Sequence, residues 1–247
     1  MDNERRRQIL EILLKEKKVN VKNLAQRLYI SEPSIRRDLA RLEKEKLLRR
    51  VHGGAVLEEH SSSFTKIPFI IRELEDYNEK NIIAGKAAEL VSDGDVIMLD
   101  ASSSAHAMIP FLAPKSNITV ITSGIKTLMR LGEYGINAYS TGGHLLASCL
   151  SLIDDDAHST IAKYNADFVF FSCRGVSEKG MVTDFSIEEN IVRAKMLEHS
   201  KKSVLLCASR KINKEYMHNL CSIKDIDYEK CETELPSYLV RKLCSEI

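Results

Sequence analysis

The chain of 247 residues lacks the features of membrane, metal-binding and disulfide-stabilised proteins. No apolar run is long enough to cross a bilayer and no secretory signal opens the sequence, so we expect a cytoplasmic protein without a membrane partner. Its cysteines form no CxxC pair and show no metal-ligand spacing. We therefore expect no metal, no cofactor, and reduced thiols of which several fill the core. These cysteines are Cys149, Cys173, Cys207, Cys221, Cys231 and Cys244.

Internal repeats and low-complexity segments are also absent, apart from one short polar stretch. Residues 57–66 contain Glu58-Glu59-His60-Ser61-Ser62-Ser63 and have little to bury, which is typical of a linker. The sequence therefore predicts an N-terminal domain over residues 1–56, a linker over 57–66 and a larger domain over 67–247. A chain of this length can bury a full core in two domains.

Charge is distributed unevenly between the two parts. Residues 1–56 hold 15 Lys and Arg against 8 Asp and Glu, a net charge of +7, and the remainder holds 21 against 27, a net charge of −6. A basic N-terminal domain joined to an acidic larger domain is typical of a nucleic-acid-binding domain joined to a small-molecule sensor.

The segment from Ser31 to Glu43 predicts an amphipathic helix with a cationic outer face. Ile35, Leu39 and Leu42 fall on one stripe at helical spacing. Ser31 is a suitable N-cap, and a proline is tolerated in the first turn. The opposite side and its flanks hold Pro33, Ser34, Arg36, Arg37, Ala40 and Arg41. An Arg-Arg pair on a helix often lies simply on a solvent-exposed face. The neighbouring segments therefore have to show whether this helix binds DNA.

Those neighbours favour a winged helix-turn-helix. Residues 4–14 and 21–28 predict two further helices, and the basic, glycine-tipped segment after Leu47 predicts a hairpin. In that fold the third helix enters the major groove of DNA, where a bidentate arginine–guanine contact gives about 1–3 kcal/mol of base discrimination. We expect double-stranded DNA to contact Ser31, Ser34, Arg36, Arg37, Arg41, Arg49, Arg50, His52 and Gly53.

From residue 67 onward, short apolar strands alternate with amphipathic helices. The expected strands are 96–99, 118–121, 136–140, 168–171 and 203–206, and the expected helices are 79–91, 104–112, 125–131 and 187–199. The buried side of helix 79–91 is expected to hold Ile82, Ile83, Ala87 and Leu90. This alternation predicts an α/β domain with a mostly parallel sheet covered on both faces, whose ligands bind beyond the carboxyl ends of the strands.

Those strand ends are rich in hydroxyl groups, glycine and cations. Each loop alone is commonly a cap or a plain turn, but their repetition at successive strand ends indicates a pocket for a small phosphorylated polyol. The segments are Asp100-Ala101-Ser102-Ser103-Ser104, Thr122-Ser123-Gly124, Thr141-Gly142-Gly143, Arg174-Gly175-Val176 and Ser209-Arg210-Lys211.

Residues 3–56 closely resemble the DeoR family of bacterial transcription regulators. The resemblance rests on Ser31-Glu32, Ile35-Arg36-Arg37-Asp38-Leu39, Leu42-Glu43, Arg50 and His52-Gly53-Gly54-Ala55. It extends more weakly to the end of the chain. It implies a C-terminal domain that is similar to ribose-phosphate isomerase and senses a phosphorylated sugar. The implied effector contacts are Lys80, Asp100, Ser102, Ser103, Ser104, Thr122, Ser123, Gly142, Gly143, Lys195 and Lys211.

The sequence departs from the family pattern at two of these loops. Ser102 stands where the family commonly has glycine, and Ala208 stands where it commonly has an acid. The first change narrows the expected phosphate loop, and the second removes a carboxylate that could bind a sugar hydroxyl.

The main hypothesis is a transcription repressor of a sugar or polyol operon, relieved by a phosphorylated sugar. Paired half-sites require a homodimer or homotetramer, which we expect to assemble through the C-terminal domain. One alternative is a sugar-phosphate isomerase with a DNA-binding head, for which Asp100 and Asp167 are candidate acids. Another is a DNA-binding regulator whose sensor pocket is vestigial.

Overall fold

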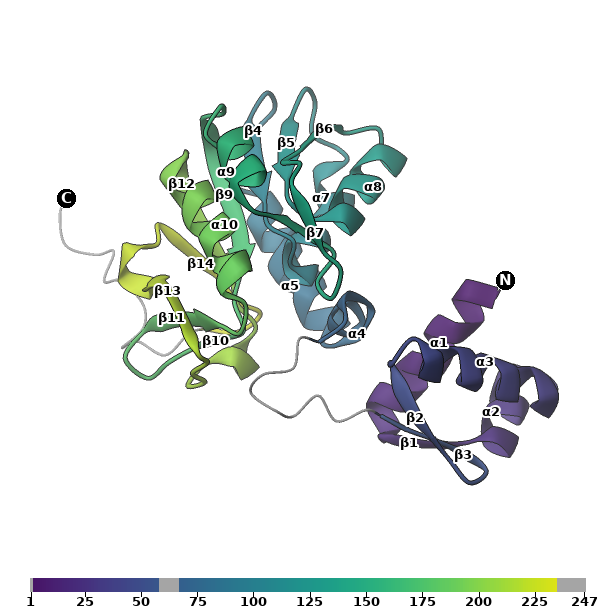
Figure 1. Ribbon diagram of the computed structural model, residues 1–247. Helices are drawn as coiled ribbons and strands as arrows, with labels where there is room; N and C mark the ends of the chain where they lie inside the picture. The colour runs from purple at the N-terminus through teal and green to yellow at the C-terminus, as the bar shows by residue number, and fades with distance from the viewer. Residues whose placement is uncertain (1, 58–66, 235–247) are drawn as a thin grey trace. The chain divides into compact units, whose positions relative to one another are not determined.

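The computed structural model describes residues 2–57 and 67–234 (Figure 1). The chain divides into two units, Met1–Glu75 and Asp76–Ile247. Nearly all of the expected linker, residues 58–66, lies outside the described residues, while Leu57 ends a strand of the head.

The N-terminal unit, here called the head, is a helix-turn-helix with a three-stranded antiparallel sheet of order β1-β3-β2. The hairpin β2–β3 is called the wing. One core, which includes Ile9, Leu13, Leu24, Ile35 and Leu39, joins all three leading helices. The elements are α1 (Asp2–Glu16), β1 (Lys18–Asn20), α2 (Val21–Leu28), α3 (Glu32–Lys44), β2 (Leu48–Val51), β3 (Gly54–Leu57) and α4 (Phe69–Leu74).

Local signals explain the turn between α2 and α3. The Asn20 side chain caps α2 by accepting from the backbone N–H of Lys22 at 2.8 Å, and Tyr29 ends the helix in the left-handed region with φ 55°. Two elements, β1 with only three residues and α4, were not predicted from the sequence. Ile67 and Ile71 belong to the head core, so the structural division falls after Glu75, later than the boundary expected after Lys66.

The larger unit is built on a six-stranded, fully parallel sheet of order β14-β12-β9-β4-β5-β6. The α/β class and the parallel sheet expected from the sequence are confirmed. The sheet strands are β4 (Val96–Leu99), β5 (Thr119–Thr122), β6 (Asn137–Ser140), β9 (Ala166–Ser172), β12 (Ser200–Leu206) and β14 (Tyr228–Lys230).

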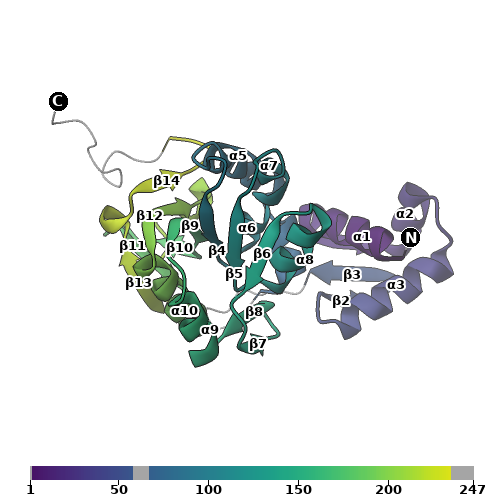
Figure 2. The ribbon, with the colours of Figure 1, turned by 90° about the horizontal axis from the view of Figure 1, so that it is seen from above.

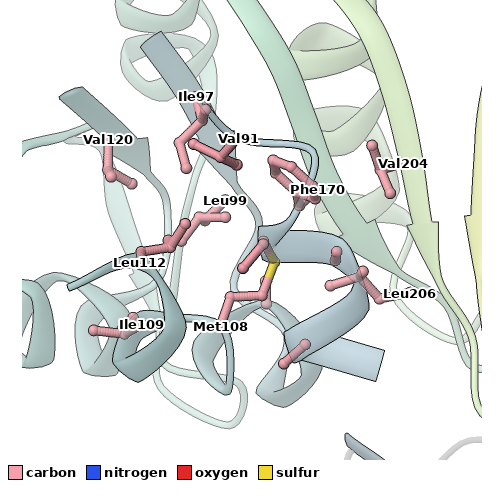
Figure 3. Close-up of a cluster of buried hydrophobic side chains, with 14 of the residues drawn as sticks. Val91, Ile97, Leu99, Met108, Ile109, Leu112, Val120, Phe170, Val204 and Leu206 are labelled. Atoms are coloured by element: carbon pink, nitrogen blue, oxygen red, sulfur yellow. The ribbon is translucent and has the colours of Figure 1, made fainter. Parts of the chain in front are cut away.

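Helices cover both faces of this sheet (Figure 2). Along β9, Phe170 faces one core while Val169 and Phe171 face the other, as the period of two requires. Figure 3 shows the first core, in which Phe170, Leu99 and Val120 of the sheet lie with Met108 and nearby helical residues. The helices of the two faces are α5 (Tyr77–Ala88), α6 (Ser103–His106), α7 (Ile109–Leu112) and α8 (Ile125–Glu133), and α9 (Asp155–Ile161) with α10 (Ile187–Glu198).

Two small antiparallel sheets flank the large one. The strands that form them are short and mixed in polarity, so they have no periodic signal in the sequence. One sheet has the order β10-β11-β13 and the other pairs β7 with β8. Their bounds are β7 (His144–Leu146), β8 (Ser151–Ile153), β10 (Gly175–Val176), β11 (Met181–Asp184) and β13 (His218–Ser222), and the single-turn 3-10 helices are Ser209–Lys211 and Ile223–Asp225.

Two details of the expected helices are wrong. The helix expected over 104–112 is two single turns, α6 and α7, with Pro110 in the first turn of the second. Ile82, expected on the buried side of α5, is 50% exposed. The buried face of α5 instead carries the small residues Ala84, Ala87 and Ala88 beside Ile83, which lets the helix approach closely and leaves the bulky Ile82 outside.

Candidate nucleic-acid interface and candidate ligand site

Helix α3 presents a basic face opposite its buried one. Ile35, Leu39 and Leu42 are buried in the head core, as the apolar stripe predicted. Arg36, Arg37 and Arg41 are exposed. Three guanidinium groups therefore project from one short helix, which has the dimensions of an element that enters the major groove.

An ion pair that the sequence analysis missed fixes the rotation of α3. Asp38 is 6% exposed on the buried side of the helix. Its Oδ1 accepts from Arg5 Nη2 of α1 at 2.9 Å, and its Oδ2 accepts from Arg5 Nε. The sequence does hold a signal for this contact, because Asp38 is a carboxylate within the apolar stripe of α3. Because this two-pronged contact ties α3 to α1, it also sets the direction of the exposed arginines.

The first turn of α3 has a hydroxyl pair instead of a side-chain cap. Ser31 occupies the N-cap position, but its side chain makes no capping bond and lies 3.0 Å from Ser34 Oγ. Ser34 Oγ accepts from Arg37 Nη2 at 3.1 Å, and Arg36 Nη2 donates to Glu32 at 3.1 Å. Exposed contacts of this kind contribute about 0–1 kcal/mol, so DNA groups can replace them at low cost.

The wing displays the remaining basic residues. Arg49, Arg50 and His52 are exposed, and Gly53 adopts φ +72° at the tip. A Cβ on Gly54 would lie 2.0 Å from the Val19 carbonyl oxygen, so only glycine allows β3 to pair with β1 here. Tyr29, in the turn before α3, is 96% exposed.

In the larger unit, the ends of three neighbouring strands are in register. Leu99 of β4 pairs with Thr122 of β5, which pairs with Ser140 of β6. The following loops therefore meet at one edge of the sheet, as predicted. The expected contacts Ser102, Ser103, Ser104, Thr122 and Ser123 are all buried at this edge.

Asp100 serves to organise this edge. Its Oδ1 accepts from the backbone N–H of Ser102 at 3.0 Å, and its Oδ2 accepts from the N–H of Ser172 at 3.3 Å and from Arg193 Nε at 2.9 Å. Both carboxylate oxygens are thus engaged within the protein. The side chain holds the loop after β4 against the end of β9.

Arg193 on α10 is the principal residue that the sequence analysis missed at this edge. Besides Asp100, it donates from Nη1 to Asp184 Oδ2 at 2.8 Å, and its Nη2 lies 3.8 Å from Glu189 Oε1. Burial opposes the charge of this guanidinium, but the three surrounding carboxylates outweigh burial and raise the Arg193 pKa above its ordinary value. No local sequence pattern identifies such a pair, because its members come from distant segments.

The serine loop is held by its own hydrogen bonds. Ser102 Oγ caps α6 by accepting from the Ala105 N–H at 3.1 Å. Because α6 has a single turn, its dipole is small, and anion binding here would depend on side-chain hydroxyls rather than on a helix N-terminus.

The next two loops are tightly packed. Thr122 Oγ1 accepts from the Gly124 N–H at 3.0 Å. The buried Thr127 hydroxyl finds no hydrogen-bond partner in the described part of the chain and lies 3.0 Å from where a Cβ on Gly124 would stand. A Cβ on Gly143 would lie 2.3 Å from the Ile153 carbonyl oxygen, whereas Gly142 is open. Close packing therefore accounts for Gly143, and the positive φ of 66° accounts for Gly142.

The three expected lysines lie in different environments. Lys211 is 7% exposed, and its Nζ donates to Ser172 Oγ at 2.9 Å. Lys80 is 4% exposed on α5, which packs against α6. Lys195 Nζ instead donates to Glu198 Oε2 at 2.8 Å. Both residues lie at the end of α10, which leads into the start of β12. The structure therefore places Lys195 toward the opposite edge of the sheet.

The candidate acids of the isomerase alternative, Asp100 and Asp167, are both engaged in contacts within the protein. Asp100 is bound as described, and Asp167 lies near the start of β9, away from the strand ends. Asp167 accepts from Lys201 Nζ at 2.8 Å and from the Val96 N–H at 2.9 Å. The hydrogen bond from Lys201 lowers the Asp167 pKa, which makes this carboxylate a weaker base.

Within residues 2–57 and 67–234, no helix has the length and hydropathy needed to span a bilayer. In the same ranges, no group of three His, Cys, Asp or Glu side chains could hold a metal ion. Among the described cysteines, Cys173, Cys207, Cys221 and Cys231 are free thiols, and Cys149, Cys173, Cys207 and Cys231 are buried.

Two solved structures resemble part of this chain. One is eIF2B delta from Chaetomium thermophilum, with a TM-score of 0.50, 16% identity and coverage of 67% of this chain and 62% of that one. The other is ribose 5-phosphate isomerase A from Methanocaldococcus jannaschii, with a TM-score of 0.44, 18% identity and coverage of 56% and 55%. This chain spans less than two thirds of either structure, and the first likeness concerns the fold alone.

Sequence relatives match nearly the whole chain. The uncharacterized HTH-type transcriptional regulator YulB of Bacillus subtilis is 36% identical, with coverage of 90% of this chain and 86% of the relative. The HTH-type transcriptional regulator GolR of Listeria innocua is 32% identical, with coverage of 97% and 94%. The glycerol-3-phosphate regulon repressor of Escherichia coli is 27% identical, with coverage of 89% and 86%. These relatives are named as regulators and not as enzymes.

Family models cover both units. The DeoR-like helix-turn-helix domain matches residues 5–61, and the DeoR C-terminal sensor domain matches residues 75–228. Together with the exposed basic face of α3, these matches show that the chain belongs to the DeoR family of DNA-binding transcriptional regulators.

Proposed function

We propose that this regulator represses an operon of sugar or polyol metabolism and leaves its operator when a phosphorylated sugar binds the larger unit. The proposal has a DNA-binding part and a ligand-binding part, each supported by its own residues.

For DNA binding, α3 would lie in the major groove, with Arg37 and Arg41 at base edges and Ser31, Ser34 and Arg36 near the entering backbone. The wing residues Arg49, Arg50, His52 and Gly53 would contact the backbone or the minor groove. The exposure of these groups, and the weakness of their contacts within the protein, support this assignment.

For ligand binding, the proposal rests on the burial and the hydrogen bonding of the Lys211 ammonium group. This buried ammonium has one hydrogen bond, to Ser172 Oγ, and forms no ion pair with a carboxylate of the described residues. A buried cation needs a counter-charge, and a phosphate would supply it. Lys80, the serines at 102–104, Thr122, Ser123 and Gly142 would complete the contacts.

The relatives are consistent with this class of ligand. The Escherichia coli relative is named for a glycerol-3-phosphate regulon, and glycerol 3-phosphate is a small phosphorylated polyol. Asp100, with both oxygens engaged, would act by holding the loop rather than by direct contact. Lys195 would have no part in the site, because it is paired with Glu198.

Operator recognition would require a homodimer or homotetramer. One α3 reads only a few base pairs, and paired half-sites about 34 Å apart need two heads related by symmetry.

The experiment is an operator titration in the presence of candidate ligands. An operator selected from random duplexes by the purified protein would be labelled, and its affinity measured by fluorescence anisotropy with phosphorylated sugars and their unphosphorylated forms. We expect one phosphate ester to weaken binding by about 5- to 150-fold, the usual range of allosteric coupling, and the unphosphorylated form to have no effect.

The matched variants are Lys211→Met and Lys179→Met, since Lys179 is an exposed lysine of the same unit. Lys211→Met should abolish the response to the ester while operator affinity without the ester stays unchanged. A panel without any response would contradict the sensing part and favour a vestigial pocket. Operator binding itself is tested in the same titration.

A further inference from the structure

Cys173 and Cys207 lie side by side where two central strands end. β9 and β12 pair in parallel with Ser172 opposite Leu206, so the next residues, Cys173 and Cys207, stand opposite each other just beyond the paired segment. Adjacent strands are about 4.8 Å apart, and a disulfide needs about 4.4–6.8 Å between its Cα atoms. Both side chains belong to the same buried cluster on one face of the sheet. This spacing permits a disulfide without a change of register.

The two thiols differ in access and in charge. Cys173 is 6% exposed, and Cys207 is fully buried. The neighbouring Cys207 thiol lowers the Cys173 pKa, and the nearby Lys211 and Arg193 cations also lower it, against burial and the Asp184 carboxylate. The neighbouring Cys173 thiol and burial raise the Cys207 pKa. Cys173 is therefore the more nucleophilic and more accessible partner.

We propose that Cys173 and Cys207 form an oxidisable dithiol beside Lys211, which a hydroperoxide converts into a disulfide. The Cys173 thiolate attacks one peroxide oxygen, the O–O bond breaks, and hydroxide leaves to give a sulfenic acid. The Cys207 sulfur then attacks the Cys173 sulfur, the S–O bond breaks, and the second oxygen leaves as water. In total, two thiols and one hydrogen peroxide give one disulfide and two waters.

The first test uses the unaltered protein. After treatment with hydrogen peroxide, blocking of free thiols and tryptic digestion, mass spectrometry should find peptide 164–174 joined to peptide 203–210, and dithiothreitol should separate them. Cys221, in peptide 215–224, is the internal control, because burial raises its pKa to about 12. We expect Cys173 to be oxidised at least about tenfold faster than Cys221. Absence of the joined peptide, or equal oxidation of both, would overturn the proposal.

Variants assign the roles within the pair. Cys207→Ser should leave a sulfenic acid on Cys173 that dimedone labels, whereas Cys173→Ser should leave Cys207 unlabelled. Lys211→Met should slow oxidation of Cys173, while Arg210→Met, which removes the neighbouring exposed cation, should not. Labelling of Cys207 in place of Cys173 would contradict the assignment. None of these measurements depends on a sugar phosphate or on DNA. Their failure would therefore be distinguishable from a failure of the proposed function.

Discussion

Arg193 and Asp100, which are 93 positions apart in the chain, form a buried ion pair with Nε 2.9 Å from Oδ2. The pair joins α10 to the loop after β4, and a second hydrogen bond from Arg193 reaches Asp184 at the end of β11. One side chain therefore connects a helix, the large sheet and the small sheet at the proposed ligand site.

The first prediction concerns Arg193→Gln. This change leaves Asp100, Asp184 and Glu189 without their shared cation in a buried setting, so we expect the free energy of unfolding to fall by about 3–5 kcal/mol. Urea denaturation measures it. The control Lys163→Gln, which removes an exposed cation, should change stability by about 0.5 kcal/mol or less. A loss from Arg193→Gln no larger than that of the control would show that the carboxylates do not need the arginine.

The second prediction concerns Asp38→Asn in the head. The substitution weakens two charge-assisted hydrogen bonds to Arg5, so we expect a loss of about 1.5–3 kcal/mol in the stability of the head. Operator affinity should also fall, because the rotation of α3 is no longer fixed. Glu45→Gln removes an exposed carboxylate near the same helix and should have little effect on either measurement. Operator affinity unchanged in Asp38→Asn would refute the positioning role.

The third prediction compares two adjacent glycines of the wing. Gly54→Ala would place a Cβ 2.0 Å from the Val19 carbonyl oxygen, so β1 and β3 must separate. We expect a loss of about 2–3 kcal/mol in the stability of the head. Gly53→Ala meets no atom within 4 Å and carries only the strain of a positive φ, about 1 kcal/mol. Thermal denaturation of both variants measures the order, and the reverse order would contradict the described β1–β3 pairing.

Much of this fold could be predicted from sequence because its main signals are local. The run at 96–99 is apolar on both faces, and it forms β4 with the bounds expected from the sequence. Helix α2 also begins and ends as expected, because Asn20 caps its start and Tyr29 its end. The stripe of α3 predicted its buried face for the same reason.

The parts that could not be predicted depend on tertiary structure. Arg193 and Asp100, and likewise Arg5 and Asp38, are ordinary charged residues until the fold brings them together. Lys195 matched a family position, but its helix turns it toward Glu198. The short strands β10, β11 and β13 are stabilised mainly by each other and by α10, so they leave no periodic signal.

The fourth prediction concerns pH. Burial raises the pKa of Glu229 on β14 above its ordinary value of 4.5. The folded state therefore binds this proton more tightly than the unfolded state, and the stability it adds is fully present below about pH 4.5 and is lost as the pH rises through the folded-state pKa. Glu229→Gln should match the parent protein at pH 4 and be more stable at pH 7 by about 0.5 kcal/mol. Urea denaturation at both pH values measures this, and a variant less stable at pH 7 would contradict the sign.

The most direct test of the central claim is the operator specificity of Arg37→Ala. The ratio of operator affinity to affinity for a random duplex would be measured by anisotropy at one fixed salt concentration. We predict that the ratio falls by about 5- to 150-fold, the equivalent of 1–3 kcal/mol for one lost base contact, while the thermal unfolding of the protein is unchanged. The control Lys179→Ala, an exposed cation of the larger unit, should keep the parent ratio. A folded Arg37→Ala protein with the parent ratio would contradict the assignment of α3 as the element that reads the operator.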